Sequence, residues 1–308
     1  MPTPPPVTLD TRLPFRAKDA LAAGISRRRL LSKGFRRIIR GVYIDAAVRP
    51  DPLHDALAVL LVTGRAAFVS HHTAARLHRA VVPHSADLHA SIGHDRHRSR
   101  TSGVTVHSST RIPVTFRGVK VTGPVDTFLD LVPHLDLVDL VVLGDSLVKR
   151  DRTTTEALVE AAASLGAGRR KALRAASLVR AKVDSPMETR LRLLVVLAGL
   201  PEPEVNIVIR DEDGAWLRRI DMGYRAPKLA LEYDGRQHAD SRDQYASDVR
   251  RREDLSNWRW REWTCVSDDI FKNPADALRR LVAVMVERGM HVPHKLSDAW
   301  RAHFPGHG

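Results

Sequence analysis

The sequence contains a single cysteine, Cys265, among its 308 residues. One thiol cannot form a disulfide framework, and it excludes a zinc site built from several cysteines. Long apolar runs are also missing, since no stretch reaches the roughly eighteen apolar residues of a membrane-spanning helix. The first residues, MPTPPPVTLDTRLPF, lack the basic and apolar segments of a secretory signal. We therefore expect a cytoplasmic protein without a membrane partner.

Acidic residues are fewer than basic ones, with 36 Asp and Glu against 49 Lys and Arg and a formal net charge of +13. Such an excess indicates a polyanionic partner. The charge is concentrated between Phe15 and Asp45, where nine basic residues stand against two acidic ones. The basic residues of this segment are Arg16, Lys18, Arg27, Arg28, Arg29, Lys33, Arg36, Arg37 and Arg40.

Residues 15–50 have the pattern of a winged helix-turn-helix. A short helix from Ala17 would end at Gly24, and Ser26 would cap a second helix over 27–33. A β-branched stretch around Gly41 is typical of a tight hairpin. The start of the second helix is where such a motif meets duplex DNA, although runs of arginine are often only a solvated helix face. The arginines predicted to contact DNA are Arg27, Arg28, Arg29, Arg36, Arg37 and Arg40.

The whole chain is expected to have a mixed α/β or α+β fold in several parts. A Pro-rich tail over 1–14 precedes the winged segment. An α/β domain with a basic helical connector is expected over 51–184, a further domain over 185–290 and a tail over 291–308. Within 51–184, helices are predicted at 53–62, 73–78, 125–135 and 169–182, and strands at 88–92, 103–107 and 118–122.

The segment 185–290 predicts a helix, three strands, a helix, a strand and a terminal helix. Ser185 is placed as N-cap, Pro186 in the first turn, and Glu188 closes a capping box onto the Ser185 amide. The strands are expected at 205–210, 216–224, 229–233 and 258–266, the second helix at 242–255 and the last one after Asn273-Pro274.

The hairpin formed by 216–224 and 229–233 carries the candidate chemistry. If residues 225–228 form the turn, Tyr224 pairs with Leu229, and counting outward places Asp221 opposite Glu232 with β-carbons roughly 5 Å apart. Asp234 shares the face of Glu232 because side chains alternate along a strand.

Two carboxylates held this close repel each other unless they share a proton or a cation. Oxygen ligands suit Mg²⁺ or Mn²⁺, which support phosphodiester hydrolysis. The alternative is that Asp221 and Glu232 form surface ion pairs with Arg218, Arg219 or Arg236. The apolar residues 229–231 beside Glu232 favour a core strand, in which a buried acid requires a partner.

The C-terminal segment resembles the domain of unknown function related to very-short-patch-repair endonucleases, in the PD-(D/E)XK nuclease superfamily. The resemblance covers roughly 185–288. It rests on Ile220-Asp221, then Leu231-Glu232-Tyr233-Asp234-Gly235-Arg236-Gln237-His238, and on Asp248, Arg252 and Leu255. It implies an Mg²⁺- or Mn²⁺-dependent endonuclease in which Asp221 and Glu232 bind the metal, Glu188 assists and His238 lies at the site.

One position departs from the superfamily pattern, because the lysine two residues after the glutamate is here Asp234. That lysine helps to position water and to stabilise negative charge. The replacement leaves the base unassigned, with Asp234, His238 and metal-bound water as candidates. The departure leaves open an inactive nuclease-like domain.

The N-terminal half resembles antitoxins of the AbiEi type. The resemblance rests on residues 16–44 and on Val69-Ser70-His71-His72-Thr73-Ala74-Ala75-Arg76-Leu77-His78. It implies a winged helix followed by an α/β domain, with operator binding or control of a toxin partner. Two functions therefore stand side by side: a duplex-DNA endonuclease, and a non-enzymatic DNA-binding regulator or antitoxin.

Fifteen histidines invite a metal site of another kind, notably at His71-His72 and His94-x-x-His97. Neighbouring histidines on a helix point in different directions, and no cysteine or acid completes a zinc set at a recognisable spacing. We therefore expect no histidine metal site.

Overall fold

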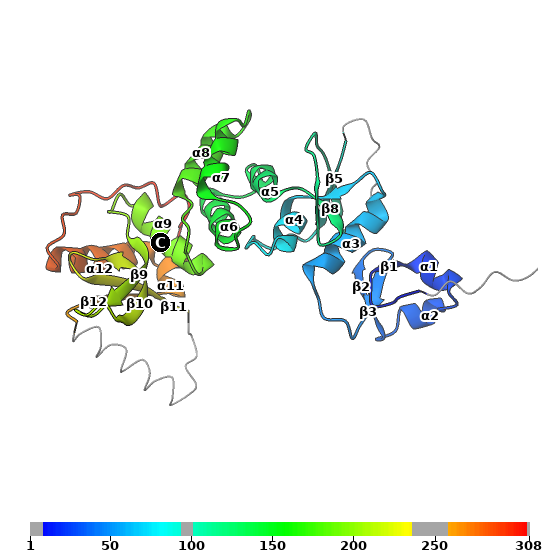
Figure 1. Cartoon of the computed structure of the whole chain (residues 1–308), viewed down its shortest axis with the longest axis horizontal. Coiled ribbons are helices and arrows are strands. Elements are labelled where there is room, and N and C mark those ends of the chain that lie inside the picture. Colours follow the sequence, from blue (N-terminus) through cyan, green and yellow to red (C-terminus); the bar gives the residue numbers. More distant parts are fainter. Residues whose placement is uncertain (1–8, 94–100, 236–257, 307–308) are drawn as a thin grey trace, which may run out of the picture. The chain divides into compact units, whose positions relative to one another are not determined.

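The computed structural model describes residues 9–93, 101–235 and 258–306. The chain has a mixed α+β architecture and divides into two compact units, which are coloured along the sequence in Figure 1. The first unit comprises residues 1–135 and 150–177, and the second comprises 136–149 and 178–308. Among the described residues, no helix combines the length and the apolar character needed to cross a membrane.

The N-terminal part of the first unit pairs two short helices with a small sheet. Its elements are β1 (Phe15–Arg16), α1 (Ala17–Ala22), α2 (Arg27–Leu30), β2 (Phe35–Ile39) and β3 (Val42–Asp45). The strand order is β1-β3-β2, with both pairings antiparallel. Gly24 and Gly41, with φ of +83° and +80°, allow the chain to turn after α1 and between β2 and β3.

The second helix is shorter than the sequence predicts. Its start is as expected, because the Ser26 side chain accepts a hydrogen bond from the Arg29 amide at 3.3 Å. It ends at Leu30 instead of Lys33. The Ser32 hydroxyl donates to the Arg29 carbonyl at 2.7 Å, and this local bond competes with the next helical one.

A five-stranded sheet with flanking helices forms the rest of the first unit. The elements are α3 (Pro52–Thr63), β4 (Phe68–Val69), α4 (His71–Leu77), β5 (Leu88–Ile92), β6 (Val104–Ser108), β7 (Val114–Phe116), β8 (Val119–Val121), α5 (Pro124–Leu131), α7 (Thr155–Ala163) and α8 (Arg169–Leu178). The strand order is β6-β5-β4-β8-β7. Its core includes Val59, Val69, Leu77 and Ala90, all fully buried.

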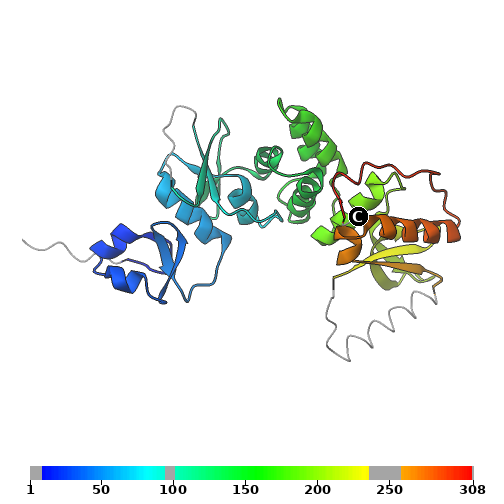
Figure 2. The same ribbon diagram turned by 180° about the vertical axis from the view of Figure 1, so that it is seen from behind.

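The second unit is built around a four-stranded sheet. Its elements are α6 (Leu137–Lys149), α9 (Pro186–Leu197), β9 (Glu204–Arg210), β10 (Trp216–Tyr224), β11 (Leu229–Asp234), β12 (Arg261–Val266), α11 (Ser267–Phe271) and α12 (Pro274–Glu287). Strands β9, β10 and β11 form an antiparallel meander, and β12 adds to β11 in parallel. Both views show α9, α11 and α12 grouped beside this sheet (Figures 1 and 2).

A buried ion pair joins α6 to α9. Arg192 is fully buried and lies 3.0 Å from Asp145, which also accepts hydrogen bonds from the Thr189 hydroxyl and the Arg180 amide, both at 2.8 Å. Breaking such a pair would leave an uncompensated buried charge. The second unit therefore includes α6 and begins before Ser185, the start that the sequence predicts for the C-terminal domain.

The elements expected in 185–290 are present wherever the structure describes them, and one helix that was not expected, α11, lies between β12 and α12. The strands β9, β10 and β11 match the predicted ranges to within one residue, whereas β12 begins at Arg261 instead of Trp258. The predicted helix over 242–255 lies outside the described residues. Of the predicted tail over 291–308, the described residues 291–306 pack onto this unit, because Trp300 and Phe304 are buried and the Ser297 amide donates to the Ala198 carbonyl at 2.9 Å.

Candidate functional site

The hairpin of β10 and β11 has the register that the sequence predicts. Tyr224 pairs with Leu229, Gly223 with Ala230 and Met222 with Leu231. These pairs end at Met222 and Leu231, and one further step in the same antiparallel register would bring Asp221 opposite Glu232. Side chains at facing positions of an antiparallel pair lie on the same face of the sheet. In this register the two acids would lie on one face of the sheet.

The close approach of the two strands depends on Gly223. A Cβ at this position would lie 2.3 Å from the carbonyl oxygen of Leu229, well inside van der Waals contact. Any side chain here would push β10 away from β11. Gly223 therefore holds the register that aligns the carboxylates two residues further along.

Glu188 reaches the same region from the first turn of α9. The Ser185 hydroxyl accepts a hydrogen bond from the Glu188 amide at 3.2 Å, as the capping-box pattern predicts. The return bond differs from the prediction, because the Glu188 carboxylate accepts from the amide of Asp184, at 2.9 Å, instead of that of Ser185. The carboxylate reaches one residue further back and still satisfies an amide at the helix start.

The pKa of Glu188 responds to the charge of Asp221, so the two side chains lie near each other. Burial raises the pKa of Glu188, and the negative charge of Asp221 raises it further, against the hydrogen bond from the Asp184 amide. Glu188 and Glu232 are only 6% and 4% exposed. Glu188 and Asp221 therefore lie close enough for their negative charges to oppose each other, and Glu232 of β11 is a further buried acid of the same unit.

Arg219, one of the three arginines named in the ion-pair alternative, contacts a different acid. Arg219 lies 2.8 Å from Asp184, which Lys149 also contacts at 2.7 Å. Although burial acts to raise it, these cations hold the pKa of Asp184 below its usual value. Arg219 thus neutralises the acid that precedes α9. Arg236, another arginine of that alternative, lies outside the described residues.

Of the two side chains predicted as candidate bases, Asp234 lies within the described residues and His238 does not. Asp234 ends β11, is partly exposed and pairs in register with Val266 of β12. Its backbone position agrees with the alternation that puts it on the face of Glu232. His238, the remaining candidate base, lies outside the described residues, as do Asp248, Arg252 and Leu255 of the same motif.

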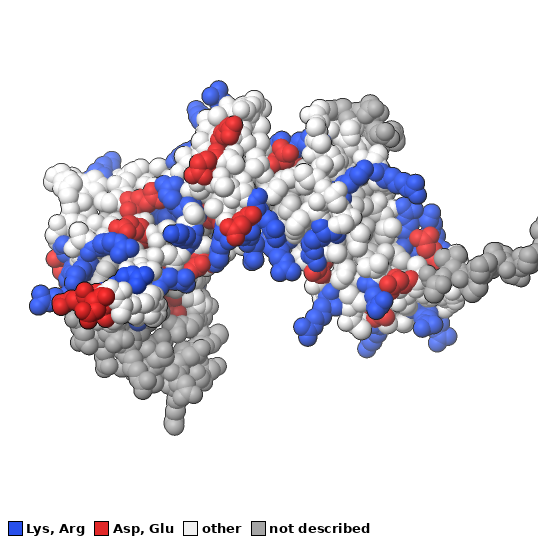
Figure 3. Space-filling view, viewed as in Figure 1, with Lys and Arg blue, Asp and Glu red and all other residues white. Residues whose placement is uncertain are grey.

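The predicted DNA-contacting arginines occupy the N-terminal part of the first unit. Arg27, Arg28 and Arg29 form most of α2 and are exposed. Basic side chains project from this part of the surface together with a few acidic ones (Figure 3). Arg36 is half-buried, and its guanidinium donates to the Val48 carbonyl at 3.5 Å, so it is the least available of the six.

A group of histidines in the first unit was not expected from the sequence. Among the described residues, His71, His107 and His134 form the group whose nitrogens could hold a metal ion. Burial, reinforced by neighbouring histidines, lowers the pKa of His71 to about 2 and that of His89 to about 4. We expected no histidine metal site because the argument from sequence compared only histidines that are close together along the chain. His71, His107 and His134 come from separate elements, so that argument did not cover them.

Comparison with known proteins yields two distant relatives. A scan against protein-family models found no match. Two uncharacterized proteins of Mycobacterium tuberculosis, MT2308 and Rv2248, are each 26% identical over 254 residues, which covers 80% of this chain and 91% of the relative. The similarity therefore spans both units.

Proposed function

We propose that this protein is a divalent-metal-dependent DNA endonuclease whose catalytic carboxylates lie on β10, β11 and α9. The observation that supports it is the hairpin register, which pairs Met222 with Leu231 and in its next step would oppose Asp221 to Glu232, with Glu188 near enough for Asp221 to raise its pKa. This arrangement also agrees with the resemblance to PD-(D/E)XK nucleases.

The donor set fits a hard divalent cation. Mg²⁺ and Mn²⁺ take carboxylate oxygens, and a cation among these acids would relieve the repulsion that their burial imposes. Asp221 and Glu232 would hold the ion. When bound, such an ion supplies Lewis-acid activation of a phosphodiester. Glu188, whose carboxylate accepts from the Asp184 amide at the start of α9 and senses the charge of Asp221, would assist.

The exposed arginines of α2 are the proposed DNA-holding surface. Arg27, Arg28 and Arg29 project from the second helix of a helix–turn–helix segment, and no acidic residue lies within that helix. Contacts to phosphates supply most of the affinity of proteins for duplex DNA. The first unit would thus bind DNA and the second would cleave it.

The decisive experiment uses the full chain with supercoiled plasmid DNA and Mg²⁺ or Mn²⁺, with EDTA as the metal-free arm. Asp221→Ala and Glu232→Ala should abolish metal-dependent cleavage and the calorimetric signal of Mg²⁺ binding, while duplex affinity stays unchanged. Glu212→Ala, an exposed acid in the turn between β9 and β10, is the matched control and should cleave normally. Cleavage at the wild-type rate by both site variants would rule out this site.

The second candidate function is a non-enzymatic DNA-binding regulator or antitoxin with an inactive nuclease-like domain. Asp234 favours it, because the resembled nucleases carry a lysine at this position. A wild-type protein that binds duplex DNA but leaves it intact across a titration of Mg²⁺ and of Mn²⁺ would support this function and exclude the first.

A further inference from the structure

Three histidines that are distant in sequence converge in the first unit. His71 begins α4, His107 lies on β6 and His134 lies in the turn after α5. One ring nitrogen from each lies within 4.8 Å of the others. The rings of His71 and His107 stack with centroids 3.6 Å apart and an interplanar angle of 12°, and His134 meets His71 edge-on at 5.2 Å. The packing of these three elements alone therefore brings the ring nitrogens together.

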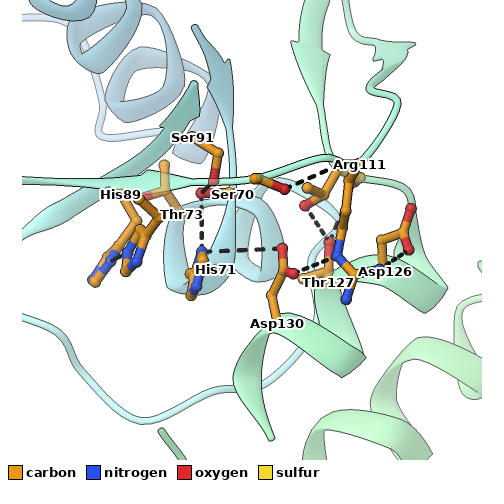
Figure 4. A network of polar contacts seen from close by, with 12 residues as sticks. Ser70, His71, Thr73, His89, Ser91, Arg111, Asp126, Thr127 and Asp130 are labelled. Carbon is orange, nitrogen blue, oxygen red and sulfur yellow. Dashed lines mark hydrogen bonds and ion pairs between the residues drawn. The ribbon is translucent and has the colours of Figure 1, made fainter. Parts of the chain in front are cut away.

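Surrounding polar groups orient two of these rings. The Nδ1 of His71 lies 3.0 Å from the Ser70 hydroxyl, which in turn accepts from the hydroxyl of Ser91 at 2.8 Å (Figure 4). The Nε2 of His107 lies 3.0 Å from the Nδ1 of His89. In metal sites, a hydrogen bond to one ring nitrogen fixes the ring so that the other nitrogen can bind the ion.

Asp130 of α5 provides a buried negative charge beside the histidines. Its side chain is 10% exposed, and Arg111 binds one of its oxygens, Oδ1. The other oxygen, Oδ2, points at His71 and lies 4.0 Å from its Nδ1 (Figure 4). Within the described residues, this oxygen has no hydrogen-bond partner. Buried carboxylate oxygens are normally satisfied, so the position calls for a cation or a donor.

Backbone strain and a cavity mark the same place. His71 has a φ of +50°, a left-handed conformation that β-carbon-bearing residues rarely adopt and that concentrates at functional sites. A cavity of about 680 Å³ opens beside it, and His71, His107 and Asp130 contribute to its lining. Solvent and ions therefore have access to the histidine cluster.

We propose that His71, His107 and His134 bind a transition-metal ion of the zinc class, with Asp130 as the neighbouring carboxylate. Imidazole nitrogen suits Zn²⁺, and three protein ligands with one open position are typical of reactive zinc sites. Zn–N bonds of about 2.0–2.1 Å place the three nitrogens closer together than the 4.8 Å limit within which they lie. His134 is exposed and can approach by a change of rotamer.

This site goes beyond the proposed nuclease activity and does not depend on it. The histidines belong to the first unit and the carboxylates to the second. The ligand chemistry also differs, since imidazole favours Zn²⁺ or Co²⁺ over Mg²⁺. A metal-binding experiment can therefore address the histidines alone when the carboxylates have been removed.

The test is a titration of the metal-free Asp221→Ala/Glu232→Ala chain with Co²⁺ and then Zn²⁺. We expect one equivalent of Co²⁺ to produce strong visible absorption, which four-coordinate cobalt shows and six-coordinate cobalt in an oxygen site does not, and Zn²⁺ to displace it. His107→Ala and His134→Ala should lose this absorption and weaken Zn²⁺ binding at least tenfold. His84→Ala, an exposed histidine of the same unit, should behave like the parent chain.

Because His134 is exposed, its replacement removes no core contact, and the circular dichroism of His134→Ala should match that of the parent chain. A loss of metal binding in this variant therefore cannot be attributed to unfolding. Asp130→Asn should weaken Zn²⁺ binding and leave the stoichiometry at one. The proposal is overturned if the parent chain shows no strong cobalt absorption, or if His134→Ala and His107→Ala bind Zn²⁺ as tightly as His84→Ala. The cluster would then be a stacked polar core only.

Discussion

The carboxylates of the second unit and the histidines of the first are assembled over very different distances along the chain. Asp221 and Glu232 lie on strands joined by the turn 225–228, whereas His71, His107 and His134 come from a helix, a strand and a turn of separate segments. The first arrangement follows from counting residues outward from a turn. The second exists only because β5, β6 and α5 pack around α4. Sequence spacing therefore detects the former site and misses the latter.

The comparison can be tested by variants that affect one site and spare the other. We take them in order of their expected effect on DNA cleavage at saturating DNA, from complete loss to no change.

Gly223→Ala should have the largest effect, because the added Cβ would collide with the Leu229 carbonyl and force β10 away from β11. We expect unfolding in urea to show a loss of about 1–3 kcal/mol, together with loss of plasmid cleavage. Cobalt binding by the histidines should persist, since they lie in the other unit.

Gly214→Ala is the matched control for this variant. A Cβ there meets nothing within 4 Å, and the only cost arises from its φ of +82°, about 1–2 kcal/mol. It should therefore lose comparable stability and keep its cleavage. Full cleavage by the Gly223→Ala protein would show that the carboxylates do not need the close register of the hairpin.

Glu188→Gln should have an intermediate effect. The amide oxygen of glutamine can still accept from the Asp184 amide, so the cap survives, but a neutral side chain is a poor partner for Mg²⁺. Cleavage should fall at least tenfold, which corresponds to about 1.4 kcal/mol of activation free energy, while the melting temperature barely moves. A protein with this substitution that cleaves like wild type would assign Glu188 to capping alone.

Replacing Arg27, Arg28 and Arg29 together by Ala should leave cleavage at saturating DNA unchanged and weaken binding instead. Each lost phosphate contact should reduce the slope of log K against log salt by about 0.9. Arg169, Arg170 and Arg174, exposed on α8, form the matched control triple. If the slope becomes flatter in the α8 variant and stays unchanged in the α2 variant, the DNA-binding surface lies on α8 instead of α2.

Local patterns predicted much of the second unit and less of the first. Caps, turns and alternating strands placed α9, β9, β10 and β11, because each signal acts within a few neighbouring residues. The two-residue strand β4, the edge strand β7 and the helix α7 of the first unit were not predicted, and neither were α6 and α11 of the second. Strands this short carry almost no periodic pattern, and they form because partners on other segments supply their hydrogen bonds.

The predicted site shows the same division. The facing positions of Asp221 and Glu232 could be counted from the turn, but the nearness of Glu188 required α9 to pack beside β10 and β11. The sequence pattern also could not predict that the Glu188 carboxylate accepts from the amide of Asp184 instead of that of Ser185. These two amides are neighbours in the chain, and only the folded backbone decides which one the carboxylate reaches.

The amino-acid sequence by itself determined the basic charge, the α+β class, the hairpin register and the start of α9, all of which follow from composition or from short-range geometry. Only the tertiary structure decided that α6 joins the second unit through the buried pair of Asp145 and Arg192. It also decided that three distant histidines face Asp130. The physical reason is that side-chain packing brings together residues whose sequence separation carries no periodic signal, so their contact can be known only once the chain has folded.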